Sequence, residues 1–306
     1  MRVAFLTLVG MVCLSLQSHA QETLVEAADK VPCRAAPDAS RIVIAGGSIT
    51  EIFFMLGEAN RIIAVDRTSN YPEEVSRFPV VGYVRALSAE GVLSLGPSLV
   101  LGEDDMGPLE VMDQLETTGI EIRRVPEEHS AQGIVEKVIC VAKIIGYSNE
   151  KLEQIRKDFT EPVRKIAAVN DVKLTPHKPR VAIVMALRDG VPFAAGNETS
   201  AHGVIEMAGG KNVFEAFDGW KPVSLEVMIE ANPSFIVMPE RGVAMSGGRD
   251  AVLGHPSVKT TDAGQRDGLI SMDGMTLLGF GPRTLQAALD LSGKIRPSRS
   301  SITDND

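Results

Sequence analysis

The chain has 306 residues and a formal net charge of −9, with 44% hydrophobic and 23% charged residues. This composition is typical of a folded globular protein and excludes a chain that is disordered throughout. Only residues 3–16 form an apolar run that approaches membrane character, which excludes a protein with several membrane spans. The excess of acidic groups argues against nucleic-acid binding through a basic surface.

The first twenty residues have the pattern of a secretory signal peptide. Arg2 precedes the apolar run, and Ser18-His19-Ala20 places small residues before a cleavage point between Ala20 and Gln21. The run is shorter than the ~20 apolar residues of a membrane span, so an anchor is the less favoured interpretation. We therefore expect an exported protein, located in the periplasm of a Gram-negative cell.

Two cysteines remain in the mature chain, Cys33 and Cys140. An exported protein can form a disulfide between them, but two buried free thiols fit the sequence nearly as well. No Cys-x-x-Cys or Cys-x-x-His pair occurs, which excludes a structural zinc site built on cysteine.

From residue 41 onward, short apolar runs alternate with helical stretches. Ser48 and Glu51 have the spacing of a capping box, which predicts that the first helix begins there. The alternation predicts a parallel sheet with helices on both faces. Strands are expected at 41–45, 61–66, 98–101 and 120–125, and helices at 48–56, 108–118 and 130–146.

Residues 148–170 differ from this pattern, because apolar residues recur every three or four positions among charged ones. They predict an amphipathic helix of ~20 residues, or ~30 Å. A second α/β pattern follows, with strands at 180–185, 234–238 and 268–272 and a closing helix from Arg283. We expect an α/β fold with two Rossmann-like lobes joined by one helix. The expected parts are a signal peptide 1–20, an N-terminal lobe 21–147, an interlobe helix 148–172, a C-terminal lobe 173–294 and a frayed tail 295–306.

One pattern occurs in both lobes. Ser88-Ala-Glu90 and Ser224-Leu-Glu226 are each followed by an apolar helical turn, then Pro-Ser and a strand, with the Pro nine residues after the first Ser. In each lobe the Ser is expected to cap a short helix that carries the Glu at its second position. Two similar lobes joined by one helix form a clamp with a ligand site between them.

Candidate chemistry centres on a loop of the first lobe. Tyr83 and Arg85 lie in Gly-Tyr-Val-Arg, and Tyr71 flanks the same region. A nearby cation stabilises a phenolate, whose free phenol has a pKa near ~10. Phenolate is a hard oxygen ligand for ferric iron, and Tyr is a known axial ligand of haem. An enzyme on a two-lobe scaffold is the less favoured alternative, because clustered cysteines, a His/Asp base and a nucleotide-binding loop are absent from the sequence.

At these residues the chain resembles the haem-binding periplasmic proteins of bacterial haem-uptake ABC transporters. These belong to a wider group that carries cobalamin and ferric siderophores. The resemblance covers residues 40–293 and includes GGSITEIFFMLG, VGYVRALSAEGVLSLGPSLVL and LLGFGPRTLQAALDL. It implies a two-lobed clamp that takes up ferric haem as its transported ligand, with Tyr83 as axial ligand of the iron and Arg85 as its hydrogen-bonding neighbour.

The resemblance also implies partners and further site residues. Glu90 and Glu226 correspond to the acids that dock on arginines of the permease dimer, which works with an ATPase. Some members of the group have a second His ligand after the strand that corresponds to 181–185. No His occurs there in this chain, which favours a five-coordinate site. As our own expectation, Arg188 meets a haem propionate instead, and Tyr71 supports the ligand.

We therefore expect an extracytoplasmic carrier of haem that is not an enzyme and meets the membrane only through the permease. Another iron chelate or a cobamide is the alternative ligand. Tyr83, in place of the Trp that would favour cobamide stacking, argues against the cobamide.

Overall fold

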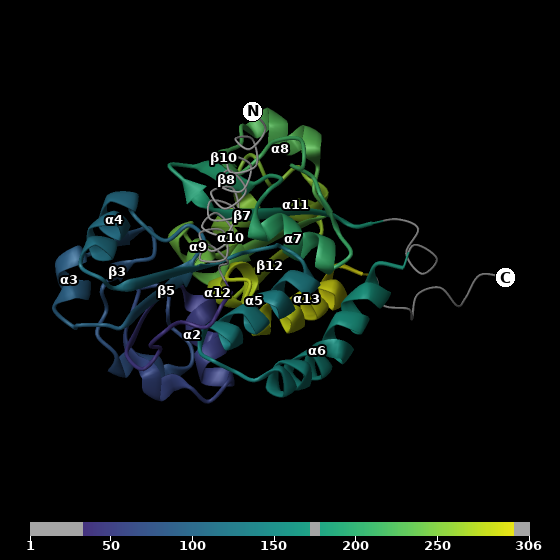
Figure 1. Cartoon of the computed structure of the whole chain (residues 1–306). Coiled ribbons are helices and arrows are strands. Elements are labelled where there is room, and N and C mark those ends of the chain that lie inside the picture. Colours follow the sequence, from purple (N-terminus) through teal and green to yellow (C-terminus); the bar gives the residue numbers. More distant parts are fainter. Residues whose placement is uncertain (1–32, 172–177, 297–306) are drawn as a thin grey trace, which may run out of the picture.

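The computed structural model describes residues 33–171 and 178–296, so the expected signal peptide and all but the start of the expected tail lie outside the described residues. Two α/β lobes lie side by side, with the N-terminal lobe in purple and blue and the C-terminal lobe in green and yellow (Figure 1). Helix α6, Asn149–Val169, runs along one side of both lobes and provides the long connection that the sequence predicts.

The N-terminal lobe contains a parallel four-stranded sheet in the order β2-β1-β5-β6. Its central strands are buried on both faces, because α2 and α5 cover one face and α3 and α4 the other, as expected of parallel sheets. The strands are β1 Ile42–Ala45, β2 Ile62–Val65, β5 Leu99–Glu103 and β6 Glu121–Val125, and a hairpin adds β3 Gly82–Tyr83 and β4 Ala86–Leu87. The helices are α2 Gly47–Met55, α3 Ala89–Leu93, α4 Leu109–Thr117 and α5 Ala131–Ile144, with 3-10 turns η1 Ala59–Arg61 and η2 Glu73–Arg77.

The predicted capping box at Ser48 and Glu51 is wrong. Helix α2 follows Gly46, whose φ of 140° is accessible to glycine, and no side chain caps the helix. Ser48 instead donates from Oγ to Oε1 of Glu103 at 2.7 Å, and Glu51 binds Arg283 of the other lobe. Both side chains have partners outside α2 that the local pattern cannot reveal.

The C-terminal lobe contains a mixed six-stranded sheet in the order β10-β8-β7-β11-β12, with β9 also paired to β7. Strand β7 turns back into β8 at Asp189 and Gly190, both of which have positive φ, and this antiparallel part was not predicted. The strands are β7 Arg180–Arg188, β8 Val191–Ala195, β9 Lys211–Asn212, β10 Trp220–Pro222, β11 Phe235–Pro239 and β12 Leu269–Met272. The helices are α7 Ser200–Met207, α8 Leu225–Ala231, α9 Glu240–Met245, α10 Arg249–Gly254, α11 Asp262–Gln265, α12 Gly274–Leu278 and α13 Pro282–Ile295.

Two helices belong to the hydrophobic cores of both lobes. Ile139 of α5 and Leu152 of α6 pack in the core of the first lobe, whereas Ile134 of α5 and Ile166 of α6 pack in the core of the second. Phe159 of α6 contacts both cores. A rotation of one lobe against the other would therefore expose part of both cores. Such a rotation is unfavourable, because the free energy gained by apolar burial is roughly proportional to the area removed from water.

A polar contact also joins the lobes. The backbone N–H of Arg283, in the first turn of α13, donates to Oε1 of Glu51 at 2.8 Å, and its Nε donates to Oε2 at 2.6 Å. The Met275 methyl group of α12 lies against Gly47 of α2. Since α2 follows β1 and α12 follows β12, the carboxyl ends of the two sheets face one another.

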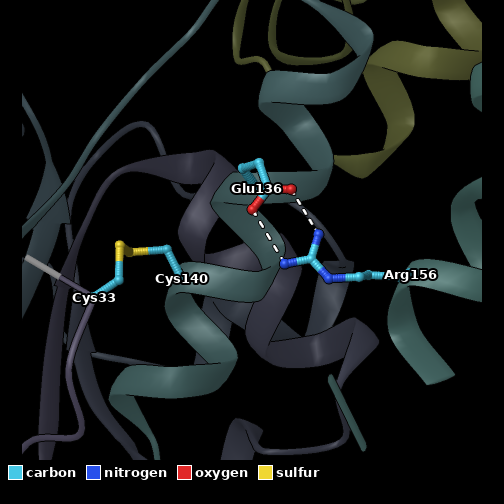
Figure 2. Close-up of a disulfide and its surroundings, with 4 residues drawn as sticks. All are labelled: Cys33, Glu136, Cys140 and Arg156. Atoms are coloured by element: carbon cyan, nitrogen blue, oxygen red, sulfur yellow. Dashed lines mark hydrogen bonds and ion pairs between the residues drawn. A yellow bond between two sulfur atoms is a disulfide. The ribbon is translucent and has the colours of Figure 1, made fainter. Parts of the chain in front are cut away.

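The two cysteines form a disulfide, which resolves the alternative that the sequence left open. Cys140 lies on α5, and Cys33 lies at the start of the described chain (Figure 2). One turn before Cys140, Glu136 accepts a bond of 2.6 Å from Nη1 of Arg156 on α6. Helix α5 is therefore tied covalently to the N-terminal segment and by an ion pair to α6.

We expect the disulfide to stabilise the N-terminal lobe, because the linked residues are 107 positions apart and a long closed loop restricts the unfolded chain most. The double change Cys33→Ser/Cys140→Ser should lower the free energy of unfolding by about 2–4 kcal/mol in urea titrations. Wild-type protein treated with a thiol reductant should show the same loss. Equal stability of the oxidised wild type and the double variant would contradict this role.

Candidate functional site

Tyr83 and Arg85 lie on a short hairpin at the carboxyl end of the first sheet. Gly82 pairs with Leu87 and Tyr83 with Ala86, so two residues form the turn. Gly82 has a φ of 122°, and a Cβ there would lie 2.6 Å from the carbonyl oxygen of Ala86. Only glycine fits this position, which explains the Gly before Tyr83 in the motif.

The turn is anchored by the buried carboxylate of Asp66, which follows β2. Its oxygens accept bonds from the N–H of Gly46 (3.0 Å), the N–H and hydroxyl of Thr68 (both 2.9 Å), the hydroxyl of Ser69 (3.0 Å) and the N–H of Val84 (3.1 Å). Val84 itself is 1% exposed. Its burial fixes the turn, with Tyr83 half-buried on one side of it and Arg85 exposed on the other.

The expected pair of Tyr83 and Arg85 is in direct contact. Nη1 of Arg85 donates to the phenol oxygen of Tyr83 at 2.5 Å, and the other terminal nitrogen, Nη2, forms an ion pair with Oδ2 of Asp105. Partial burial opposes the charge of Arg85, but Asp105 and Tyr83 outweigh it and raise the pKa of the guanidinium. The result is a chain of phenol, guanidinium and carboxylate at the end of β5.

Asp105 was missed by the sequence analysis. It lies twenty residues beyond Arg85, and nothing in the intervening pattern indicates that the loop after β5 folds back on the hairpin. The N–H of Gly107, which donates to the carbonyl of Val84 at 2.9 Å, makes that connection.

Beside the linked side chains of Tyr83, Arg85 and Asp105 lies a second polar cluster, at the junction of β5 with α2 and α5. Glu103 accepts from Ser48 at 2.7 Å, and Nζ of Lys137 donates to the Ser48 hydroxyl at 3.3 Å and to Glu127 at 2.8 Å. Burial raises the pKa of the Glu103 carboxyl to about 7, against the opposing influence of Lys137. Glu103 therefore exchanges its proton near neutral pH.

The other two expected ligand-support residues lie elsewhere. The ring of Tyr71 stacks on the guanidinium of Arg283, 3.6 Å from its centre, at the junction of the lobes. Arg188 ends β7, and its guanidinium lies 4.1 Å from the centre of the Phe193 ring. Among the described residues, neither forms a hydrogen bond, ion pair or ring contact with Tyr83 or Arg85.

Glu90 and Glu226 occupy the expected equivalent positions. The hydroxyl of Ser88 accepts from the N–H of Gly91, and that of Ser224 accepts from the N–H of Val227, so each Glu is the second residue of a capped helix. Both are exposed. Hydrogen bonds from its own backbone N–H and from Ser224 lower the pKa of the Glu226 carboxyl. Figure 1 shows their helices, α3 and α8, on the outer edges of different lobes.

The described ranges, 33–171 and 178–296, contain no cluster of three or more His, Cys, Asp or Glu side chains arranged to hold a metal ion. Nor do they contain a helix with the length and apolar character needed to cross a membrane.

Two α/β lobes whose sheets face each other at their carboxyl ends, joined by one long helix, define a ligand-binding protein of the clamp type. The chain belongs to the periplasmic binding protein family, which it matches over residues 42–275. The family confirms the expected fold class.

Solved structures of haem-binding proteins are similar to this chain over most of its length. The periplasmic haem-binding protein RhuT from Roseiflexus sp. RS-1 is 34% identical, with a TM-score of 0.76 over 84% of this chain and 98% of that one. The periplasmic haem-binding protein HutB of Vibrio cholerae is 31% identical, with a TM-score of 0.73 over 85% of this chain and 100% of that one. A vitamin B12-binding protein of Vibrio campbellii is 25% identical over 210 residues, which are 68% of this chain and 74% of the relative. All three are named as binding proteins and none as an enzyme.

We expect Glu103 to make stability depend on pH. The raised pKa means that the folded protein holds a proton that the unfolded chain, with a pKa near 4.5, has released. The stabilisation that comes from this bound proton is therefore complete below pH 4.5 and is lost as the pH rises through about 7. Over this range the free energy of unfolding falls by up to about 1.4 kcal/mol per pH unit.

Urea unfolding of Glu103→Gln and wild type across this range tests the effect. The variant should show a flatter dependence of the unfolding free energy on pH, whereas Glu110→Gln, at an exposed acid, should follow the wild type. A slope that Glu103→Gln leaves unchanged would assign the titration to another group.

Proposed function

We propose that this protein binds ferric haem between its lobes and delivers it to an ABC permease. The observation that carries the proposal is the 2.5 Å contact between the Arg85 guanidinium and the phenol oxygen of Tyr83 at the carboxyl end of the first sheet. The phenol oxygen is a hard oxygen ligand of the kind that ferric iron binds, and the guanidinium beside it supplies positive charge next to that ligand. The two terminal nitrogens of Arg85 bind Tyr83 and Asp105.

The proposed site is five-coordinate, with Tyr83 as the protein ligand. The described histidines already have other neighbours, which supports this. His129 packs edge-on against Phe280 with ring centres 5.0 Å apart, and Nδ1 of His255 lies 2.7 Å from the hydroxyl of Ser257. Nδ1 of His202 lies 3.4 Å from the amide nitrogen of Asn212.

Arg188 and Tyr71 have separate roles in the proposal. Arg188 is exposed at the end of β7, where its guanidinium can leave Phe193 to pair with a haem propionate. Tyr71, stacked on Arg283, supports the ligand from the lobe junction.

Haem is favoured over a cobamide or a ferric siderophore by two observations. The haem-binding neighbours reach 34% identity over 84% of the chain, whereas the B12-binding relative reaches 25% over 68%. A phenol with a cationic partner also suits an iron centre. The family supports an extracytoplasmic location, and the signal peptide ending at Ala20 is our proposal for how the protein reaches the periplasm.

Titration of hemin into wild type and Tyr83→Ala tests the ligand. Wild type should give a high-spin ferric spectrum with a phenolate charge-transfer band, and the variant should lose that band. Hemin affinity should also fall, because the variant has no oxygen at this position to bind the iron. Tyr71→Ala is the matched control. It removes a phenol that supports the ligand but does not bind the iron, so it should keep the charge-transfer band even if hemin affinity falls. Identical spectra for wild type and Tyr83→Ala, or tight binding of cyanocobalamin instead of hemin, would reject the proposal.

We also propose that Glu90 and Glu226 dock the loaded protein on the permease. The two acids occupy equivalent positions on two lobes, which suits a partner with two-fold symmetry and a basic pocket for each lobe. The helix around Glu226 adds apolar surface, with Leu225 41%, Val227 46% and Ile229 38% exposed. Large apolar side chains grouped on one exposed helix are typical of a contact surface.

The double change Glu90→Ala/Glu226→Ala should leave hemin titration unchanged and reduce haem-stimulated ATPase activity in reconstituted transporter. Glu116→Ala/Glu206→Ala removes one exposed acid from another helix of each lobe and should leave both measurements unchanged. Normal ATPase stimulation by Glu90→Ala/Glu226→Ala would exclude the docking role. Loss of hemin binding would instead place these acids at the ligand site.

A further inference from the structure

Arg85 needs help to stay on the Tyr83 oxygen. Its side chain is 56% exposed, and an arginine has four rotatable bonds that can take the guanidinium away from any one partner. A single contact to a phenol would therefore be made for only part of the time. The electrostatic stabilisation that Arg85 gives to the Tyr83 oxygen therefore depends on the groups that hold the guanidinium in place.

Asp105 supplies a second fixed point. The two terminal nitrogens of Arg85 are divided between partners, with Nη1 on Tyr83 and Nη2 on Asp105. Because the guanidinium is planar and rigid, fixing one nitrogen fixes the direction of the other.

Asp105 is itself held by the backbone on both sides. Nη1 of Arg124, on β6, donates to the carbonyl of Asp104 at 2.8 Å and to that of Met106 at 2.6 Å. Met106 is 1% exposed, and the next residue, Gly107, is bonded to Val84 in the hairpin turn. The loop that carries Asp105 is therefore clamped to the same turn that carries Tyr83 and Arg85.

We infer that Asp105 is a positioning residue for the haem ligand, which orients Arg85 on the Tyr83 oxygen and so sets how firmly the phenolate holds ferric iron. The inference rests on the proposed function. The charged groups around the phenol are Arg85 on the hairpin, Asp105 on the loop after β5, Asp66 beneath the turn and Arg124 behind the loop.

Orientation and charge act in opposite directions, which makes the inference testable. The carboxylate orients the guanidinium, but its own negative charge disfavours a second anion nearby. An amide at position 105 keeps an acceptor oxygen and removes the repulsion, whereas alanine removes the acceptor as well.

The test combines two measurements. One is a hemin titration, and the other is an acid titration of the haem complex, which gives the midpoint pH at which half of the phenolate charge-transfer band is lost. Asp105→Ala should weaken hemin binding about two- to fivefold and raise that midpoint by about 0.3–0.7 pH unit, the range of an exposed ion pair. Asp105→Asn should have its midpoint at or below that of wild type. Asp104→Ala, a change at the exposed neighbouring acid, should match wild type.

Two outcomes would overturn the inference. In one, Asp105→Ala behaves as Asp104→Ala does. In the other, Asp105→Asn raises the midpoint as far as Asp105→Ala, which would mean that an acceptor oxygen at position 105 does not orient Arg85. Failure of the proposed function gives a different result, because Tyr83→Phe would then keep the wild-type spectrum and no variant at position 105 would move a ligand band.

Discussion

The candidate site depends on one buried carboxylate. Asp66 is fully buried, and a buried carboxylate is costly unless donors surround it. Its donors come from three separate segments, at the start of α2, in the loop after β2 and in the turn between Tyr83 and Arg85. Asp66 is not expected to bind the ligand, but it fixes the position of Tyr83 and Arg85, which are. Loss of this one acceptor would leave several N–H groups unsatisfied together.

The contacts between the lobes are of two kinds that act at different places. Apolar packing through α5 and α6 joins the cores along one side of the molecule. At the facing ends of the sheets, Glu51 accepts hydrogen bonds from the backbone N–H and the guanidinium of Arg283, in the first turn of α13. The same guanidinium stacks on the ring of Tyr71. A carboxylate near a helix N-terminus is favoured by the helix dipole, so one lobe caps a helix of the other.

Local patterns in the sequence predicted what depends on local interactions. The continuous apolar runs predicted the buried strands of the first sheet, and Ser-x-Glu predicted both capped helices with Glu at the second position. The capping box at Ser48 failed because its partners lie on β5 and α13. Asp66 and Asp105 were missed because their roles come from loops that meet only in the folded chain. The β7–β8 hairpin was missed although its turn, Asp189-Gly190, has positive φ at both residues and lies between apolar runs, which is a strong local signal for a hairpin.

The covalent link between Cys33 and Cys140 ties stability to the chemistry of the surroundings. A reducing compartment such as the bacterial cytosol keeps thiols unpaired, so a chain that has not left it lacks the bond. A chain without the bond is expected to unfold more readily than the oxidised protein. Recombinant protein produced in a reducing cytosol would share this lower stability, and oxidation after purification would restore it.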